Sequence, residues 1–343
     1  MSSETKHPAI TPEQAVLFRK MGAIFMPHLQ KQRDAVYQMD GTSGVHAKSA
    51  RFVHYTTAKA ALGIINTKRL WMRNTQCMSD YREVQHGYDL LQNYFSEEVN
   101  KSAFTDAVDA CSPGAASKAV SQFDQWWRDV RFNTYVTSIS EHDTREDLHG
   151  RLSMWRAFGG ETARVALVLN IPWGIDAVRA LGLFFNPVAY LNEKEACDVL
   201  HEATANIKGH KEFLQTVDSQ LLVGFVLTMF ITAVTSLKHE GFREEREWRA
   251  TYLPHILPSS LMESSTEVIC GVPQLIYKVP LDESVSTALS SLEFSSIFDR
   301  LIVGPSRYPG PMYEAFKGAL VKAGVPQATA EKQVYISGIP LRV

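Results

Sequence analysis

Short candidate strands separated by helical segments are the feature of this sequence that most constrains its fold. Runs rich in β-branched and aromatic residues recur after residue 50, and the segments between them carry apolar residues at helical spacing. The expected strands are 51–55, 70–74, 133–140, 164–169, 245–253, 268–278, 300–303 and 334–337. Because no strand–helix–strand unit repeats, this arrangement predicts an α+β or mixed α/β fold.

The chain is expected to contain a helical preface, a linker and one larger domain. Its 343 residues are enough to bury a substantial core. Thr11, Pro12 and Gln14 predict a helix start with a capping box, and the turn-rich stretch 40–50 predicts a linker. The assignment is an N-terminal extension at 1–50, a main domain at 51–343 and, inside it, a mostly helical insertion at about 190–240.

Charge and cysteine content narrow the functional classes. The net charge of −2 gives no basic excess, which argues against a protein that wraps duplex nucleic acid but leaves a local basic groove open. The 4 cysteines are widely spaced without a CxxC pair, which argues against a zinc site or a disulfide framework. The N-terminus shows no signal-peptide pattern, so a cytoplasmic location is expected.

One long apolar segment raises the question of a membrane. Residues 221–237 carry no charge. The length of this run is at the lower limit for a helix that spans a bilayer. Thr228, Thr232 and Thr235 dilute the segment, and Lys238 follows it directly. We therefore expect a buried core helix and no membrane partner.

Three strand-like segments place polar residues at every second position. The pairs are His54 with Thr56, Ser138 with Ser140, and Glu245 with Glu247. Side chains alternate between the faces of a strand, so each pair is expected to share a face, while Trp248 points to the core. A histidine, a Ser-x-Ser and a Glu-x-Glu on neighbouring strands suit the binding of a nicotinamide dinucleotide and cleavage of its glycosidic bond. The charged run 141–151 predicts a solvated loop without metal-ligand spacing.

Seven short motifs occur in a characteristic order. They are His54-Tyr55-Thr56, Leu70-Trp71 with Asn74 ahead of Ser79-Asp80, Ser138-Ile139-Ser140-Glu141, Met154-Trp155-Arg156-Ala157-Phe158-Gly159, Glu245-Arg246-Glu247-Trp248-Arg249, Ile302-Val303-Gly304-Pro305 and Ile339-Pro340-Leu341-Arg342. This succession resembles a bacterial family catalogued as a domain of unknown function that lies near the ADP-ribosyltransferases. The resemblance spans residues 51–343. It departs after Asp80, where members often continue Asp-Pro-x-Glu and this chain has Tyr81-Arg82-Glu83, which leaves the role of Asp80 open.

The resemblance implies a fold and a set of site residues. The implied core is two small packed β-sheets flanked by helices, with NAD in the cleft between them. ADP-ribosyltransferases hold the cofactor with an arginine or a histidine on the first core strand, and here Arg51 and His54 compete for that place, with His54 favoured. The residues expected to contact NAD are Arg51, His54, Tyr55, Thr56, Asn74, Ser138, Ser140, Trp155 and Arg156.

The catalytic roles follow from the chemistry of nicotinamide loss. Glu247 is expected to stabilise the oxocarbenium-like ribose, and Glu245 to act as a base on the acceptor. Ser138 or Ser140 would orient Glu247, Tyr55 or Trp155 would stack on a ring, and the segment from Trp155 to Gly160 would form a cover. Trp155 is alternatively a packing aromatic of the core.

The sequence therefore predicts a cytoplasmic, NAD-dependent ADP-ribosyltransferase that needs no metal. The acceptor is left open between protein and nucleic acid. Fold-level analogy suggests a bacterial toxin or phage-defence effector, and whether an antitoxin or other partner restrains it also stays open. The alternatives are a non-catalytic nucleotide- or protein-binding module and, third, a metal-dependent nuclease built on Asp80 with Glu83 or on Glu245 with Glu247.

Overall fold

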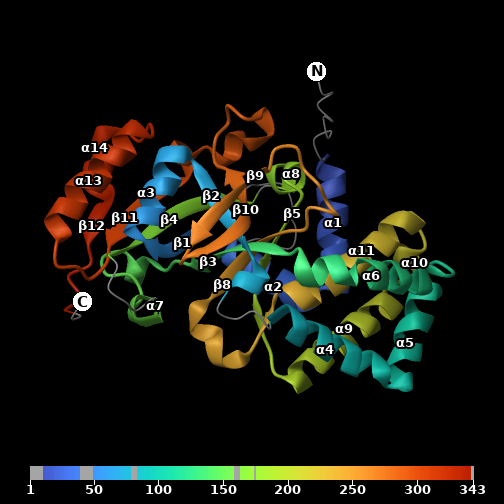
Figure 1. Ribbon diagram of the computed structural model, residues 1–343. Coiled ribbons are helices and arrows are strands. Elements are labelled where there is room, and N and C mark those ends of the chain that lie inside the picture. Colours follow the sequence, from blue (N-terminus) through green and yellow to red (C-terminus); the bar gives the residue numbers. More distant parts are fainter. Residues whose placement is uncertain (1–10, 39–48, 79–82, 158–162, 174, 341–343) are drawn as a thin grey trace.

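The computed structural model describes residues 11–38, 49–78, 83–157, 163–173 and 175–340, and it shows a mixed α/β protein (Figure 1). The helices are α1 (Pro12–Phe25), α2 (Pro27–Val36), α3 (Ala58–Thr67), α4 (Glu83–Ser96), α5 (Glu98–Asp109), α6 (Ala115–Phe132), α7 (Leu152–Ala157), α8 (Ile175–Ala180), α9 (Glu193–Gly209), α10 (Lys211–Leu214), α11 (Ser219–Thr235), α12 (Phe294–Ile297), α13 (Pro309–Lys322) and α14 (Gln327–Gln333). The strands are β1 (Ser49–Thr57), β2 (Arg69–Asn74), β3 (Tyr135–Glu141), β4 (Arg164–Pro172), β5 (Leu183–Pro187), β6 (Ala189–Tyr190), β7 (Leu237–Lys238), β8 (Glu247–Tyr252), β9 (Glu263–Ile269), β10 (Val272–Pro280), β11 (Phe298–Val303) and β12 (Val334–Ile336).

The described strands form a 10-stranded sheet and a separate two-stranded pair of β6 and β7. The main path of the large sheet runs β12-β11-β4-β1-β3-β2-β10-β9, while β8 pairs with β3 on one side and β5 on the other. Neighbours in the large sheet are antiparallel except for β11 and β12, which are parallel. The resemblance predicts two small packed sheets. The described strands do not form them, because β1 to β4 belong to one sheet.

The large sheet branches at β3, where one edge is shared by two strands. β1 pairs with the end of β3 through Val53 opposite Ser140, whereas β2 pairs with its beginning through Arg73 opposite Val136. The other edge of β3 pairs with β8 along its length, from Tyr135 to Ser140. β1 and β2 therefore leave a gap in the ladder beside the middle of β3, and the candidate site lies at this gap.

Helices cover the sheet in two groups (Figure 1). One core joins α1, α2, α4, α5, α6, α9 and α11 through buried apolar side chains such as Phe25, Phe104 and Phe230. A second core lies between the sheet and α3, α8, α12, α13 and α14, with Phe294 and Phe316 fully enclosed. The helix start predicted at Thr11 is confirmed, since the Thr11 side chain accepts from Gln14 in a capping box. The two helices of the N-terminal extension, α1 and α2, pack against α9, α11 and β5.

The uncharged segment 221–237 forms most of α11, as predicted for a buried core helix. Its side chains are buried on several sides, including Val226, Phe230 and Thr232. Within the described residues, none of the helices combines the length and apolar character needed to cross a bilayer.

The contact between α4 and α11 depends on a glycine, which gives a testable prediction. A Cβ on Gly87 would lie 2.7 Å from the Val234 Cα, whereas a Cβ on Gly63 in α3 meets no atom within 4 Å. We expect Gly87→Ala to lower the free energy of unfolding by about 1–3 kcal/mol through overpacking. Gly63→Ala should leave it unchanged or raise it by up to about 1 kcal/mol, because alanine favours helices. Urea denaturation of both variants checks this, and equal effects would contradict it.

Candidate functional site

A buried carboxylate at the start of β8 is the centre of the candidate site. Glu247 is 5% exposed and lies opposite Ser140 in the β3–β8 ladder. The Ser138 hydroxyl donates to Glu247 Oε1 at 2.5 Å, and Arg249 Nε donates to the same oxygen at 2.7 Å. The Glu247 backbone N–H donates to the Tyr190 hydroxyl at 2.8 Å. Both the side chain and the backbone of Glu247 are therefore held in place, as the prediction for Ser138 requires.

Two cations and two further carboxylates complete a charged cluster around Glu247. Lys238 Nζ lies 2.8 Å from Glu245 Oε2, 3.1 Å from Glu83 Oε1 and 3.4 Å from Glu247 Oε2. Arg249 also pairs with Glu83, which begins α4. We refer to Glu83, Lys238, Glu245, Glu247 and Arg249 as the acid cluster. It holds three carboxylates against two cations, and burial makes each of these pairs strong.

Glu245 reaches the acid cluster by a different route from the predicted one. The strand begins only at Glu247, and Glu245 is the last residue of a 3₁₀ turn from Glu240. Arg246 between them adopts a left-handed conformation with φ of 45°. The prediction that Glu245 and Glu247 share a strand face is therefore wrong. The turn and Lys238 nevertheless bring the two carboxylates together.

The surroundings of the two acids shift their pKa values in opposite directions. Burial alone would raise the pKa of Glu247, but Arg249, Lys238 and the Ser138 hydroxyl together lower it to about 2. Burial raises the pKa of Glu245, and the Glu247 carboxylate adds to this although Lys238 opposes it. Glu247 is therefore ionised at neutral pH, while Glu245 is the carboxyl more able to take up a proton.

His54 lies at the gap in the sheet, on the other face from Glu247. Val53 is opposite Ser140, and Ser140 is opposite Glu247, so these three side chains share one face. The next residue, His54, points to the opposite face. Its Nδ1 nevertheless lies 2.9 Å from the Ser138 carbonyl oxygen, which the gap between β1 and β2 leaves available. Ser138 thus contacts His54 through its backbone and Glu247 through its hydroxyl.

The protonation state of His54 follows from this contact. A carbonyl oxygen only accepts hydrogen bonds, so Nδ1 must carry the proton. Burial lowers the pKa of the His54 imidazole, which keeps it neutral at pH 7. Nε2 then carries a lone pair and can accept a hydrogen bond.

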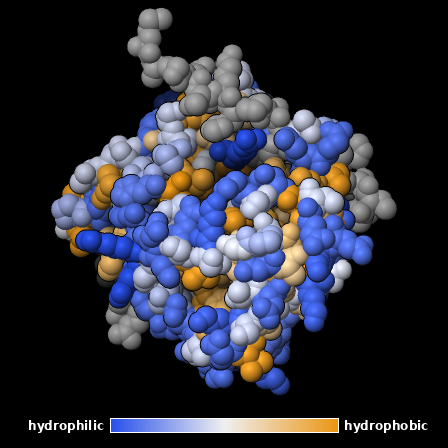
Figure 2. All heavy atoms as spheres, turned by 90° about the vertical axis from the view of Figure 1, so that its right-hand side faces the viewer, coloured by the Kyte–Doolittle hydropathy of each residue, from blue (hydrophilic) through white to orange (hydrophobic). Residues whose placement is uncertain are grey.

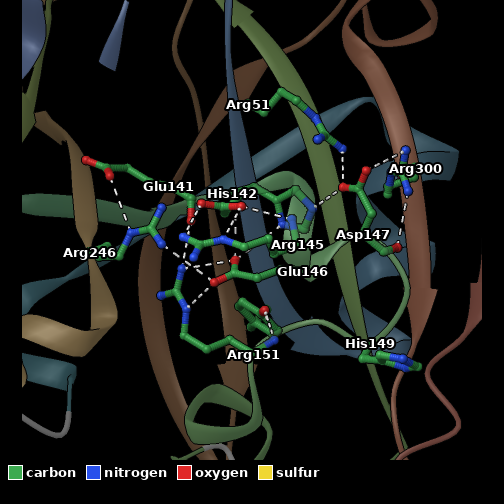
Figure 3. Close-up of polar contacts among 12 residues, drawn as sticks. Arg51, Glu141, His142, Arg145, Glu146, Asp147, His149, Arg151, Arg246 and Arg300 are labelled. Atoms are coloured by element: carbon green, nitrogen blue, oxygen red, sulfur yellow. Dashed lines mark hydrogen bonds and ion pairs between the residues drawn. The ribbon is translucent and has the colours of Figure 1, made fainter. Parts of the chain in front are cut away.

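Arg51, the competing candidate on β1, belongs to a second charged cluster (Figure 3). Its guanidinium donates to Asp147 at 2.6 Å and to Asp299 at 2.6 Å. Asp147 also lies 2.9 Å from His142 Nε2 and pairs with Arg300. Two carboxylates already pair with the Arg51 guanidinium. The geometry therefore favours His54 over Arg51 as the residue of β1 that would bind a cofactor.

The run 141–151 is not the solvated loop expected from its charges. The His142 side chain is fully buried, and Arg151 donates to Glu146 and to the backbone oxygens of Glu141 and Glu244. Figure 3 shows these side chains pointing toward one another from the loop and from the neighbouring strands. The charges pair with one another, so most of the run folds back on the sheet, while Thr144, Arg145 and Leu148 stay exposed.

The remaining predicted contact residues lie in varied surroundings. The rings of Tyr55 and Trp155 pack edge to face with their centroids 5.0 Å apart, and the two residues are 5% and 4% exposed. The interpretation of Trp155 as a core aromatic is therefore confirmed, and neither ring is free to stack on a ligand. Asn74 caps a 3₁₀ turn and donates to the Phe132 carbonyl. Ser140 is buried, Thr56 is half-buried and Arg156 is exposed on α7. Asp80, Gly159 and Gly160 lie outside the described residues.

Sequence reasoning missed three members of the acid cluster. Lys238 and Arg249 received no role, and Glu83 was named only as a carboxylate of the nuclease alternative, yet all three belong to the charged network around Glu247 and Glu245. One signal was present, since the glutamate of the Asp-Pro-x-Glu pattern falls on Glu83. Lys238 gave no comparable signal, because only the fold brings β7 beside β8.

The described residues contain no group of three or more histidine, cysteine, aspartate or glutamate side chains arranged to hold a metal ion. Glu83, Glu245 and Glu247 do meet, but Lys238 and Arg249 lie among them. The four cysteines are free.

The lowered pKa of Glu247 predicts acid-sensitive folding. The carboxyl titrates at about 2 in the folded protein against an ordinary value of 4.5, so the folded state binds fewer protons between these values. Its contribution to stability is therefore full above pH 4.5 and is lost as the pH falls toward 2. We expect urea midpoints to drop across this window in the wild type and to drop less in Glu247→Gln. Urea midpoints that fall equally with pH in the two proteins would contradict the lowered pKa of Glu247.

Comparison with known proteins gives one partial match. Residues 154–250 match the model of a family described as protein of unknown function (DUF2971). The segment runs from α7 to β8 and contains Lys238, Glu245, Glu247 and Arg249, but neither β1 nor β3. Searches of curated proteins and of solved structures return no match.

Proposed function

We propose that the protein is an NAD-dependent ADP-ribosyltransferase whose reaction centre is the acid cluster at the start of β8. The observation that carries the proposal is the pair Glu245 and Glu247, which lie two residues apart and share Lys238. Their pKa values are pushed apart, which is the usual mark of one carboxylate that stays ionised and another that moves a proton.

The proposed reaction uses the two acids in turn. The bond from ribose C1′ to the nicotinamide nitrogen breaks, and nicotinamide leaves as a neutral base with the electron pair. The Glu247 carboxylate stabilises the positive charge that develops on the ribose. Glu245 takes the proton of the acceptor nucleophile as that nucleophile bonds to C1′. Nicotinamide is already cationic in NAD, so no general acid is needed for its departure.

Ser138 and His54 serve binding and orientation in this proposal. The Ser138 hydroxyl fixes Glu247, and the Ser138 carbonyl fixes the His54 ring with its Nε2 available. Because His54 and Glu247 point to opposite faces of the sheet, the proposal requires NAD to extend through the gap between β1 and β2, where Nε2 can accept from one of its hydroxyl groups. The succession of motifs in the sequence, with its expected histidine and Ser-x-Ser, supports these two roles in the proposal.

Nicotinamide release from NAD by the purified chain tests the proposal. Release should rise when an acceptor is added, and cell lysate supplies candidates of both classes, protein and nucleic acid. His54→Ala should raise KM for NAD more than it lowers kcat, because the residue binds and does not react. No release by folded protein, with lysate or without, would overturn the proposal.

A second candidate is a nucleotide- or protein-binding module without chemistry. It is favoured because both carboxylate oxygens of Glu247 already have partners, namely Ser138, Arg249 and Lys238. In that case NAD or a related nucleotide binds without turnover, which calorimetry with intact NAD recovered at the end would show.

The acceptor and biological role are further proposals. The net charge of −2 favours a protein or single-stranded nucleic acid over duplex as acceptor. The resemblance of the sequence motifs to ADP-ribosylating toxins is the basis for proposing a role in bacterial conflict, with a partner protein that restrains activity. Labelled NAD followed by separation of protein and nucleic acid would identify the acceptor class.

A further inference from the structure

A large cavity lies between the helices and the face of the sheet opposite the acid cluster. Its volume is about 600 Å³, within the range of roughly 300–1,000 Å³ that small-molecule sites occupy. α1, α2, α8 and α11 line one side, and β3, β5 and β8 line the other. Figure 2 turns the side of α1 and α10 toward the viewer and shows hydrophobic residues in hollows between hydrophilic ones.

The wall of the cavity is mainly apolar. Phe18, Phe225 and Trp173 contribute aromatic rings, and Ile139 and Ala250 contribute the sheet surface. The cavity is partly open to solvent, so a small molecule can enter it. A cavity of this size and lining therefore suits an apolar ligand body.

Three arginines, Arg19, Arg33 and Arg179, interrupt the apolar lining, and Arg33 is partly buried. Arg33, from α2, donates to the side-chain oxygens of Asn186 and Gln30, which are both neutral amides. Among the described residues it forms no ion pair, and its Nε is buried without an acceptor. The neighbouring carboxylate of Asp34 is occupied by Arg19 at 3.2 Å and by the Gln30 amide at 2.9 Å.

This arrangement is costly unless an anion joins it. A guanidinium keeps its proton in proteins, so its partial burial without an ion pair carries a desolvation penalty. The two amides, the Trp173 ring, whose centre lies 5.7 Å from the guanidinium, and the nearby Asp34 carboxylate offset this penalty only in part. Burial lowers the pKa of Arg33 to about 10. One turn further along α2, the Tyr37 hydroxyl is also buried and has no hydrogen-bond partner in the described part of the chain.

We propose that this cavity binds a monocarboxylate with an extended apolar body, whose carboxylate pairs with Arg33 and whose body lies against Phe18, Phe225 and Trp173. The geometry of an arginine fork suits a planar carboxylate, which can accept two parallel hydrogen bonds. The site does not involve Glu247 or His54, so it stands independently of the proposed enzymatic activity.

Calorimetric titration of the full chain with sodium dodecanoate, below its micelle-forming concentration, tests the site. We expect one molecule bound per chain, with tryptophan fluorescence changing in step because Trp173 lines the cavity. Arg33→Met should weaken binding by about tenfold or more, because it removes the charge-assisted pair but keeps the volume. The same variant should melt at a higher temperature without ligand, because it removes a partly buried charge that has no ion pair.

Two further comparisons make the test decisive. A Cβ on Gly224 in α11 or on Gly318 in α13 meets no atom within 4 Å, but only Gly224 lines the cavity. Gly224→Phe should therefore abolish binding, while Gly318→Phe should leave it unchanged. Dodecanol, which lacks the charge, should bind equally to wild type and Arg33→Met. Absence of binding by folded wild type, or equal dodecanoate affinity in Arg33→Met, would overturn the proposal.

Discussion

Glu247→Gln should reduce nicotinamide release by roughly 10²–10³-fold while the protein remains folded. Glutamine keeps the size of the side chain and can still meet the Ser138 hydroxyl and Arg249, but it removes the negative charge that the developing ribose cation needs. The folded state tolerates the change because Glu83 and Glu245 remain to pair with Arg249 and Lys238. Initial rates at saturating NAD, with circular dichroism to verify folding, measure the effect.

Neighbouring glutamates provide the controls for this experiment. Glu244 is exposed, so Glu244→Gln should release nicotinamide at the wild-type rate. Glu245→Gln should lower transfer to an acceptor more than it lowers NAD cleavage, since the proposed base acts on the acceptor. Full activity in Glu247→Gln would remove the acid cluster from the chemistry and leave the binding module as the better reading.

Arg249→Met should lower the free energy of unfolding by about 3–5 kcal/mol, because it removes one partner of a buried charge network. The Arg249 side chain is 4% exposed and pairs with both Glu83 and Glu247. Without it, three carboxylates share only Lys238. Urea denaturation monitored by tryptophan fluorescence measures the loss, and Arg145→Met, which breaks a pair whose arginine is 86% exposed, should have little effect.

A double variant separates the charge effect from lost packing. If repulsion among unpaired carboxylates causes the loss, Glu83→Gln should restore part of the stability of Arg249→Met. If the two single effects simply add, the network contributes no coupling and the pairs seen around Arg249 are energetically independent. If Arg249→Met lowers the free energy of unfolding by less than about 1 kcal/mol, the acid cluster contributes no more than weak surface ion pairs do.

Local patterns predicted most of the elements and several of the contacts. The capping box at Thr11, the buried helix after Asp218 and the burial of Trp248 follow from spacing and polarity alone. The segment 268–278 was expected to be a single strand, but it contains a hairpin turn at Cys270 and Gly271, which have φ of 52° and 81°. Asparagine or aspartate is the usual partner of glycine in such turns, so cysteine there gave no clear signal.

The register between strands is what the sequence alone could not supply. Alternation states which residues share a face within one strand, but only the pairing of Val53 with Ser140 decides which face of β1 meets Glu247. The same limit hid Lys238 and Glu83, which approach the site from distant segments. The loop 141–151 was misjudged because its charges are satisfied by one another and by Arg51, Arg246 and Arg300.

The two central strands β3 and β8 form a wall whose sides carry different chemistry. Ser138 and Glu247 face the acid cluster, whereas Thr137, Ile139 and Ala250 face the cavity. Because side chains alternate, inserting or deleting one residue in either strand would send each set to the wrong side. Point substitutions can therefore alter one side without touching the other, but the lengths of these strands are constrained by both at once.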